Sequence, residues 1–211
     1  TLFSGGAVVC CKGFATEKFL EILETMEVTW FSAVPTILQA IAQDLPQGGI
    51  NHRLRFIRSG SASLPFTVAE ELERVLAVPV IEAYATTETV LISSNPVSMN
   101  RRKRGSAGIP RECEVEIRNS EGSPPVSPQR GEIWVRGPLV MKGYENDEEE
   151  NARVLVDGWY RTGDEGYFDE EGYLYITGRI KETINRGGEK ISPGEIDEIL
   201  LSHPEVLEAA A

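Results

Sequence analysis

Hydrophobic positions along residues 15–83 switch repeatedly between helical and strand spacing. Apolar residues recur at helical spacing in 15–27, and the next run, 28–34, is rich in β-branched and aromatic residues. Further helices and strands are expected in turn at 35–44, 54–58, 65–76 and 78–83. Alternation of this kind predicts a parallel sheet covered by helices.

Two polar loops follow strands of this predicted sheet. Residues 59–63 read Ser-Gly-Ser-Ala-Ser, and residues 84–88 read Tyr-Ala-Thr-Thr-Glu. In open parallel sheets, ligands bind beyond the carboxyl ends of the strands. Both loops are therefore expected at a ligand-binding edge.

After Pro96 the sequence pattern predicts short strands separated by turns. These strands are expected at 114–118, 131–136, 166–168 and 173–177. Near Arg179 an extended, glycine-rich segment begins, and a helix at 193–202 and a strand from about Val206 are expected after it. The predicted fold class is therefore α/β with an antiparallel β subdomain, followed by the start of an α+β segment. The expected domain boundaries are 1–97 for the α/β part, 98–178 for the β subdomain and 179–211 for the C-terminal domain.

The composition is that of an ordinary globular protein, with 41% hydrophobic and 26% charged residues among 211. A formal net charge of −12 argues against the broad basic surface of a nonspecific nucleic-acid binder, so nucleic acid is not expected as a partner. The one dense basic run, 101–104, is interpreted as a solvated loop.

The three cysteines, Cys10, Cys11 and Cys113, have no metal-ligand spacing. They are interpreted as buried small hydrophobic residues in a reduced compartment. No run approaches the roughly 18 apolar residues of a membrane span, and the first residues lack the pattern of a signal peptide. A cytoplasmic location is expected, with a peroxisomal one as the alternative in a eukaryote.

Polar residues in the two loops match the chemistry of nucleotide binding. The run from Gly60 to Ala62 lets the backbone approach a flat ligand, although a turn of small residues after a strand is also an ordinary structural element. Tyr84, Thr87 and Glu88 offer a ring face, a hydroxyl and a carboxylate, which suit stacking on a base, contact with phosphate and binding of Mg²⁺. Helix capping by the threonine and the glutamate is the alternative interpretation.

Further candidates lie in the second half of the chain. Asp164 follows a glycine in an expected turn, where its carboxylate can accept two hydrogen bonds from vicinal hydroxyls such as those of ribose. Arg179 supplies a fork of donors for ribose or phosphate oxygens, with a surface salt bridge as the alternative. Lys181 belongs to a charged run that also fits a solvated face, whereas Gly187 and Gly188 indicate a bend or the close approach of a ligand.

Residues 160–164, Tyr-Arg-Thr-Gly-Asp, and residues 178–195 resemble signature motifs of the adenylate-forming superfamily. That superfamily includes acyl-CoA synthetases, luciferases and the adenylation domains of nonribosomal peptide synthetases. The stretches 84–88 and 131–144 resemble two further motifs in the family's order. The similarity covers essentially the whole chain and is greatest to small-acid and fatty acyl-CoA synthetases.

The resemblance implies an ATP site built from both halves of the chain. Gly60, Ser61 and Ala62 would line the adenine site. Tyr84 would stack on the base, and Asp164 would bind the ribose hydroxyls.

The resemblance also implies roles in catalysis and in domain movement. Thr87 would contact phosphate, Glu88 would hold Mg²⁺ and Arg179 would reach ribose or phosphate. Lys181 falls at the hinge on which the family's C-terminal domain rotates between half-reactions, and Gly188 falls where that domain lines the pantetheine passage. Thr87, Glu88 and Lys181 are thus the candidate catalytic residues, and ATP or AMP, Mg²⁺ and coenzyme A are the expected ligands.

The implied reaction joins a carboxylic acid to coenzyme A through an acyl-adenylate. The family's Ser/Thr/Gly-rich phosphate loop has no counterpart here, and the chain stops before the lysine that the family uses in adenylation. We therefore expect an interior piece of a longer enzyme that alone binds nucleotide weakly and turns over little or nothing. Related oxalate and acyl synthetases tend to carry a histidine a few residues after the Thr-Glu pair, whereas residues 89–92 here are Thr-Val-Leu-Ile, so the acid stays open.

Two alternatives remain beside the acyl-CoA synthetase. The same adenylation can deliver the acyl group to a carrier-protein phosphopantetheine, as in peptide or polyketide assembly lines. A non-catalytic nucleotide-binding module belongs to a different class, and it would keep its cellular function when Asp164 is replaced by Ala.

Overall fold

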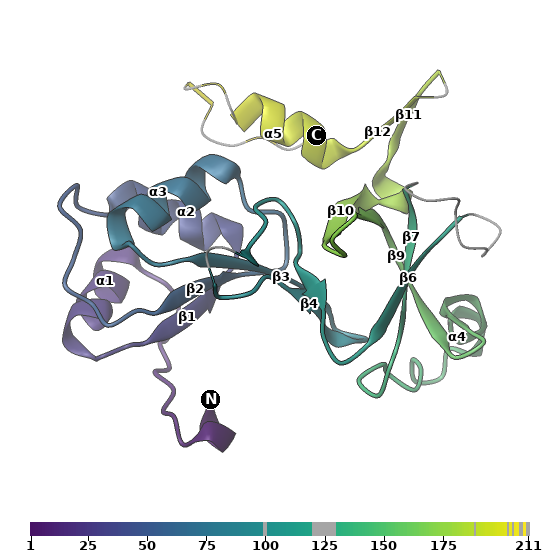
Figure 1. Cartoon of the computed structure of the whole chain (residues 1–211), viewed down its shortest axis with the longest axis horizontal. Coiled ribbons are helices and arrows are strands. Elements are labelled where there is room, and N and C mark those ends of the chain that lie inside the picture. The colour runs from purple at the N-terminus through teal and green to yellow at the C-terminus, as the bar shows by residue number, and fades with distance from the viewer. Residues whose placement is uncertain are drawn as a thin grey trace.

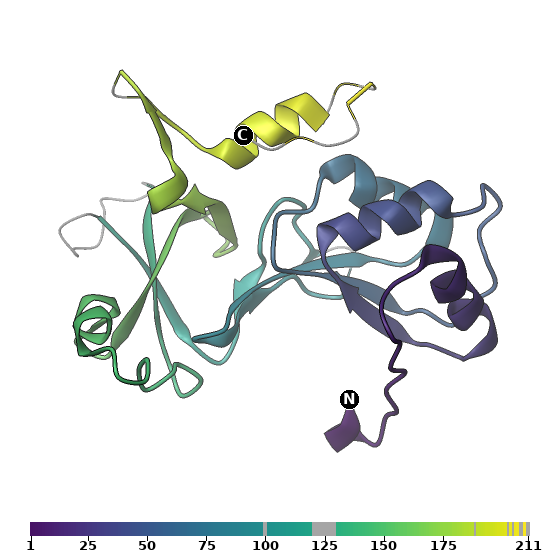
Figure 2. The same ribbon diagram turned by 180° about the vertical axis from the view of Figure 1, so that it is seen from behind.

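The structure is a computed structural model that describes residues 1–98, 101–119, 130–187, 189–201, 203, 205, 206 and 209. Two sheets make up most of the molecule, and in Figures 1 and 2 they form two lobes side by side. The predicted fold class, α/β with an antiparallel β part, is confirmed. The expected domain boundaries stay a prediction.

The first sheet contains five strands in chain order: β1 (Trp30–Ala33), β2 (Phe56–Ser59), β3 (Val80–Thr86), β4 (Val90–Ser94) and β5 (Ile109–Pro110). β1, β2 and β3 are parallel, whereas β4 and β5 pair antiparallel. The three helices of this lobe are α1 (Thr16–Thr25), α2 (Pro35–Asp44) and α3 (Phe66–Leu76). The helix predicted over 35–44 is confirmed with Pro35 in its first turn, where a missing N–H costs nothing.

One hydrophobic core joins the helices to the first sheet. Leu23 of α1, Leu38 of α2 and Leu72 of α3 are buried in it together with Ile57 of β2 and Val80 of β3. Because strand side chains alternate between faces, Phe56 lies on the opposite face from Ile57, where its ring stacks on Trp30.

The second sheet is antiparallel with the order β10-β9-β7-β6, and β8 adds to β9. Its strands are β6 (Glu114–Arg118), β7 (Gly131–Arg136), β8 (Leu155–Val156), β9 (Trp159–Phe168) and β10 (Leu174–Arg179). The helix α4 (Glu148–Val154), which sequence analysis missed, begins at Asp147, whose side chain accepts a hydrogen bond from the Glu150 N–H.

Short elements occupy the two ends of the described chain. They are η1 (Leu2–Ser4), η3 (Ile180–Glu182), β11 (Ile184–Arg186), β12 (Glu189–Ile191) and α5 (Pro193–Leu201). β11 and β12 form a hairpin that projects from the second sheet, and α5 follows it (Figures 1 and 2). The helix predicted over 193–202 is thus found, while the strand expected from about Val206 falls almost wholly outside the described residues.

A second hydrophobic core joins the two sheets. Tyr84 of β3 and Ile92 of β4 pack there with Ile133 of β7 and Leu174 of β10. At the same junction Gly108 pairs with Leu174, accepting a hydrogen bond of 2.8 Å from the Leu174 N–H. A Cβ on Gly108 would lie 2.0 Å from the Ser94 carbonyl carbon, so only glycine lets the chain pass this close to the end of β4.

Two motif loops differ from expectation. The predicted loop 84–88 begins inside β3, and its last residues form the turn of a β3–β4 hairpin, so the helix-capping alternative is wrong. Asp164 does not lie in a turn, because β9 runs continuously from Trp159 to Phe168. Both segments are held extended by pairing with neighbouring antiparallel strands. The glycine and threonine residues in the sequence indicate turns locally and give no sign of these strand partners.

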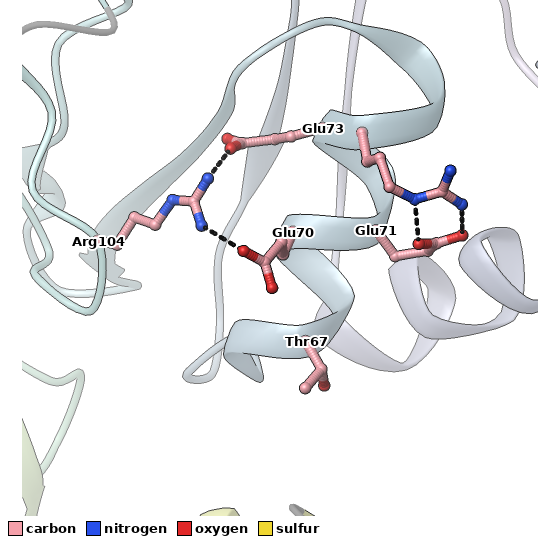
Figure 3. A pocket seen from close by; sticks show the side chains of 6 residues that line it. Thr67, Glu70, Glu71, Glu73 and Arg104 are labelled. Carbon is pink, nitrogen blue, oxygen red and sulfur yellow. Dashed lines mark hydrogen bonds and ion pairs between the residues drawn. The ribbon is translucent and has the colours of Figure 1, made fainter.

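The basic run is not a solvated loop. The Arg102 and Glu73 side chains, 5% and 8% exposed, lie 2.5 Å apart and bond both backbone groups of Val80. Arg104 reaches Glu73 and Glu70 across an open depression beside α3 (Figure 3). Lys103 pairs with Asp169 at the β9–β10 turn, so the run ties the two lobes together.

The cysteine interpretation is wrong for two of the three residues. Cys10 and Cys11 are exposed, and Cys113 is half-buried. Cys10 and Cys11 lie in the stretch without regular structure between η1 and α1, which Figure 1 shows extending away from the lobes.

We predict that Glu73→Gln lowers the free energy of unfolding by about 3 kcal/mol, because it removes the negative charge from a buried ion pair with Arg102. Urea denaturation measures the change. Glu71→Gln is the matched control, since Glu71 pairs with Arg74 on the exposed side of the same helix. Equal midpoints for the two variants would show that the Arg102 pair contributes nothing beyond a surface contact.

Candidate functional site

Asp164 and Tyr84 meet where the two sheets join. Asp164 of β9 is 5% exposed, and its Oδ2 accepts a hydrogen bond from the Tyr84 hydroxyl. On its other side the Arg179 Nε lies 3.2 Å from Asp164 Oδ1. Arg179 is directly opposite Asp164 in the β9–β10 register, which explains why two residues distant in sequence form this pair.

Burial dominates the electrostatics of this pair. Burial raises the pKa of the Asp164 carboxyl above its usual value, and the Tyr84 hydrogen bond and the Arg179 charge oppose that rise only in part. Burial, together with the nearby Asp164 charge, also raises the pKa of the Tyr84 phenol. Tyr84 therefore keeps its proton and remains a donor to Asp164.

Glu88 lies in the turn between β3 and β4 and is held by the loop that follows β7. The Tyr144 hydroxyl donates a 2.8 Å hydrogen bond to Glu88 Oε1, and the Met141 N–H donates to the Glu88 carbonyl at 2.7 Å. Burial alone would raise the pKa of Glu88, but hydrogen bonds from Tyr144 and the turn, with the charge of Arg179, outweigh it and lower the pKa. Glu88 is therefore an anion with a fixed position.

Tyr144 is itself fixed by Asn151 of α4. The Asn151 side chain accepts from the Tyr144 N–H at 2.6 Å and donates to the Tyr144 carbonyl at 2.8 Å. Gly143 has φ 144°, and a Cβ there would meet the Asn151 amide at 2.9 Å. Sequence analysis noted Tyr144 only as part of a motif, and no local signal connects it with Glu88.

The small-residue loop after β2 lies against the backbone of β3. A Cβ on Gly60 would be 3.6 Å from the Ala83 carbonyl oxygen, and Ser61 adopts φ 76°. Directly before the loop, the Ser59 hydroxyl is buried and has no hydrogen-bond partner within the part of the chain that the structure describes. A buried hydroxyl without a partner is typical of a place where a ligand or water completes the structure.

Thr87, Lys181 and Gly188 are the remaining predicted residues. Thr87 is exposed at the tip of the β3–β4 turn. Lys181 is exposed in η3, and its charge acts on Glu150 of α4. Gly188 lies outside the described residues, so its predicted role stays a prediction.

Glu88 is the residue here that suits a metal ion. Its carboxylate accepts a hydrogen bond from the Thr86 hydroxyl, and carboxylate and hydroxyl oxygens are donors that Mg²⁺ prefers. The described ranges contain no group of three His, Cys, Asp or Glu residues that could hold a metal by themselves. A site with one carboxylate fits Mg²⁺, which commonly shares its coordination between one or two carboxylates, substrate phosphates and water.

We predict that Asp164→Asn stabilises the protein at neutral pH. The raised pKa means that the folded state holds the Asp164 proton more tightly than the unfolded state, so ionisation costs stability as the pH rises through the raised value. Asn does not ionise, so the variant's melting temperature should exceed that of the wild type at pH 7, and the excess should vanish as the pH falls toward the usual value of 3.8. A wild type that melts higher at pH 7 would contradict the raised pKa.

Asp169→Asn is the control with the opposite sign. Burial favours a higher pKa for Asp169, but hydrogen bonds from Lys103 and from two backbone N–H groups lower it below the usual value. Its charged form therefore stabilises the fold above the usual pKa, and that stabilisation disappears as the pH falls through the lowered value. The variant should melt below the wild type at pH 7 and approach it in acid.

Comparison with known proteins identifies the family. A family model described as AMP-binding enzyme matches residues 1–145. A Humulus lupulus protein named Probable CoA ligase CCL9 is 45% identical over 100% of this chain and 41% of the relative. An oxalate–CoA ligase of Arabidopsis thaliana is 46% identical over 94% of this chain and 39% of the relative.

The structural comparison agrees. O-succinylbenzoate coenzyme A synthetase from Bacillus subtilis, solved in complex with ATP and magnesium ion, matches with a TM-score of 0.83 and 38% identity. The match covers 93% of this chain and 41% of the solved one, so the chain spans about two fifths of the length of these relatives. The resemblance to adenylate-forming enzymes is thereby confirmed, and the chain belongs to the AMP-binding enzyme family.

Proposed function

We propose that the protein to which this chain belongs is an AMP-forming ligase that joins a carboxylic acid to coenzyme A. The observation that carries the proposal is the buried Asp164 carboxylate, held between Tyr84 and Arg179 at the edge where strands of the first sheet end. Glu88 lies at the same edge, in the turn after β3. The named relatives that match over nearly all of this chain are CoA ligases, which supports coenzyme A as the acceptor in preference to a carrier protein.

The nucleotide would be held by residues from both lobes. Asp164 accepts from the two ribose hydroxyls, because an anionic carboxylate offers paired acceptor oxygens. Arg179, whose side chain is 63% exposed, is free to reach ribose or phosphate oxygens with donors other than the Nε beside Asp164. The base lies on the loop at Gly60, Ser61 and Ala62. Because the Tyr84 hydroxyl is hydrogen-bonded to Asp164, Tyr84 contacts the base through its ring.

Mg²⁺, when bound, neutralises phosphate charge during displacement at phosphorus. Glu88 would hold it, oriented by Tyr144, and Thr87 would donate from the tip of the turn to a phosphate oxygen. These residues bind and orient, and none of them forms a covalent bond to the substrate.

The proposed chemistry has two displacements. An oxygen of the substrate carboxylate attacks the α-phosphorus of ATP, the bond to the bridging oxygen breaks, and pyrophosphate leaves with the acyl-adenylate formed. The coenzyme A thiolate then attacks the acyl carbon and AMP leaves. Both steps depend mainly on positioning and charge neutralisation.

Rotation of the C-terminal segment would convert the site from the first displacement to the second. Lys181 lies in η3, directly after the sheet ends and before the β11–β12 hairpin, as a hinge requires. Gly188, which lies outside the described residues, would line the pantetheine passage.

The proposed substrate is a carboxylic acid, and its identity within that class is left open. Ile92 is fully buried in the core between the sheets, so it does not contact substrate. Leu91 instead lines an open cavity with Leu139 and Arg111. Acid-dependent exchange of pyrophosphate into ATP, with a panel from oxalate and acetate to aryl and long-chain acids, would identify it.

We predict that Asp164→Ala weakens AMP binding by about 10-fold to 100-fold, the scale of lost hydrogen bonds to a charged group. Isothermal titration calorimetry measures the affinity, and Glu71→Gln, far from the site on α3, should bind like the wild type. Unchanged AMP affinity in Asp164→Ala would refute the ribose assignment and with it the proposed nucleotide site.

We predict that Glu88→Gln raises the Mg²⁺ concentration needed for half-maximal ATP binding by about 10-fold, because the anionic ligand is lost. AMP binding without metal should change little, which separates a metal defect from a damaged fold. Tyr144→Phe should give a smaller shift in the same direction, since the Glu88 charge remains while its hydrogen bond at 2.8 Å is removed. Equal losses for AMP and ATP would argue against Glu88 as the metal ligand.

A further inference from the structure

The strand that carries Asp164 contains a β-bulge at the motif. β7 and β9 pair at Glu132 with Glu165 and at Trp134 with Arg161, so residues 162–164 of β9 face Ile133 alone. Gly163 in the middle of the bulge has φ 73°. A bulge of this kind redirects a side chain that a regular strand would point elsewhere.

Thr162 replaces the backbone hydrogen bonds that the bulge interrupts. Its hydroxyl donates to the Ile133 carbonyl at 2.8 Å and accepts from the Asp164 N–H at 3.1 Å. The hydroxyl therefore connects β7 directly to the backbone of Asp164. A methyl group in the same position could make neither bond.

Glu132 holds the bulge from the other side. Glu132 is 9% exposed. Its Oε2 accepts hydrogen bonds from Arg161 Nε at 3.1 Å, Arg161 Nη2 at 2.9 Å and Trp134 Nε1 at 3.0 Å. Its Oε1 accepts from the Gly163 N–H at 3.3 Å. One buried carboxylate thus binds side chains on both strands and the backbone beside Asp164.

We propose that Glu132 and Thr162 are positioning residues that set where the Asp164 carboxylate stands for the ribose. The inference rests on the proposed nucleotide site and adds residues that do not touch the nucleotide. The Asp164 carboxylate is bonded by Tyr84 and Arg179, and its N–H is bonded by Thr162. Loss of the bulge contacts therefore changes the direction of the carboxylate while both side-chain partners are still present. The result is a loss of selectivity for the ribose hydroxyls, rather than a uniform loss of binding.

The test compares AMP with 2′-deoxy-AMP and 3′-deoxy-AMP by titration calorimetry. In the wild-type protein each missing hydroxyl should weaken binding by about 10-fold. In Thr162→Val and in Glu132→Gln the ratio should fall to about 2-fold or less, because the misplaced carboxylate no longer distinguishes the sugars. Thr162→Ser keeps the hydroxyl and should keep the wild-type ratio.

Glu114→Gln is the matched control for Glu132, since Glu114 pairs with Arg136 at 3.0 Å on the same sheet but is exposed and distant from the bulge. A wild-type ratio in Thr162→Val or Glu132→Gln, even with weaker binding overall, would overturn the proposal and leave the nucleotide site standing. A wild-type protein that binds the three nucleotides equally would instead overturn the ribose role of Asp164. The two variants remove different contacts, so either one that folds decides the question.

Discussion

A buried carboxylate at the junction of two sheets is the constraint on which this structure depends. Asp164 is 5% exposed, and the Tyr84 hydroxyl and the Arg179 guanidinium bond its two oxygens and offset part of the cost of burying it. Tyr84 belongs to the first sheet, and the other two residues belong to the second. The contact therefore exists only when the two sheets stand in one relative position.

Several features of the molecule secure that position. The core around Ile92 and Leu174 fills the space between the sheets, and the backbone pairing of Gly108 with Leu174 links them. The basic run at 101–104 adds ionic contacts to α3 and to the β9–β10 turn, one of them buried. A change that loosened this junction would move Asp164 relative to Gly60 and Glu88.

The two carboxylates of the site differ in a way that follows from their surroundings. Burial raises the pKa of Asp164, whereas several hydrogen bonds and a nearby arginine lower the pKa of Glu88. The charged form of Asp164 costs stability, and its two oxygens are kept away from solvent. Glu88 is a fixed anion in a turn, as a metal ligand should be. Different environments thus support the separate roles proposed for them.

The sequence by itself determined the alternation of helices and strands, the helix at 35–44, the strands at 114–118 and 131–136, and the family, because these depend on local spacing and on ordered short motifs. Only the tertiary structure decided that the segment at Tyr84 belongs to a hairpin and that Asp164 lies on a bulge. It also decided that the basic run forms ion pairs with α3 and with the β9–β10 turn. The bonds that build the site join residues 80 positions apart for Tyr84 with Asp164 and 56 apart for Glu88 with Tyr144. Such contacts form between surfaces that folding brings together, so no pattern along the chain records them.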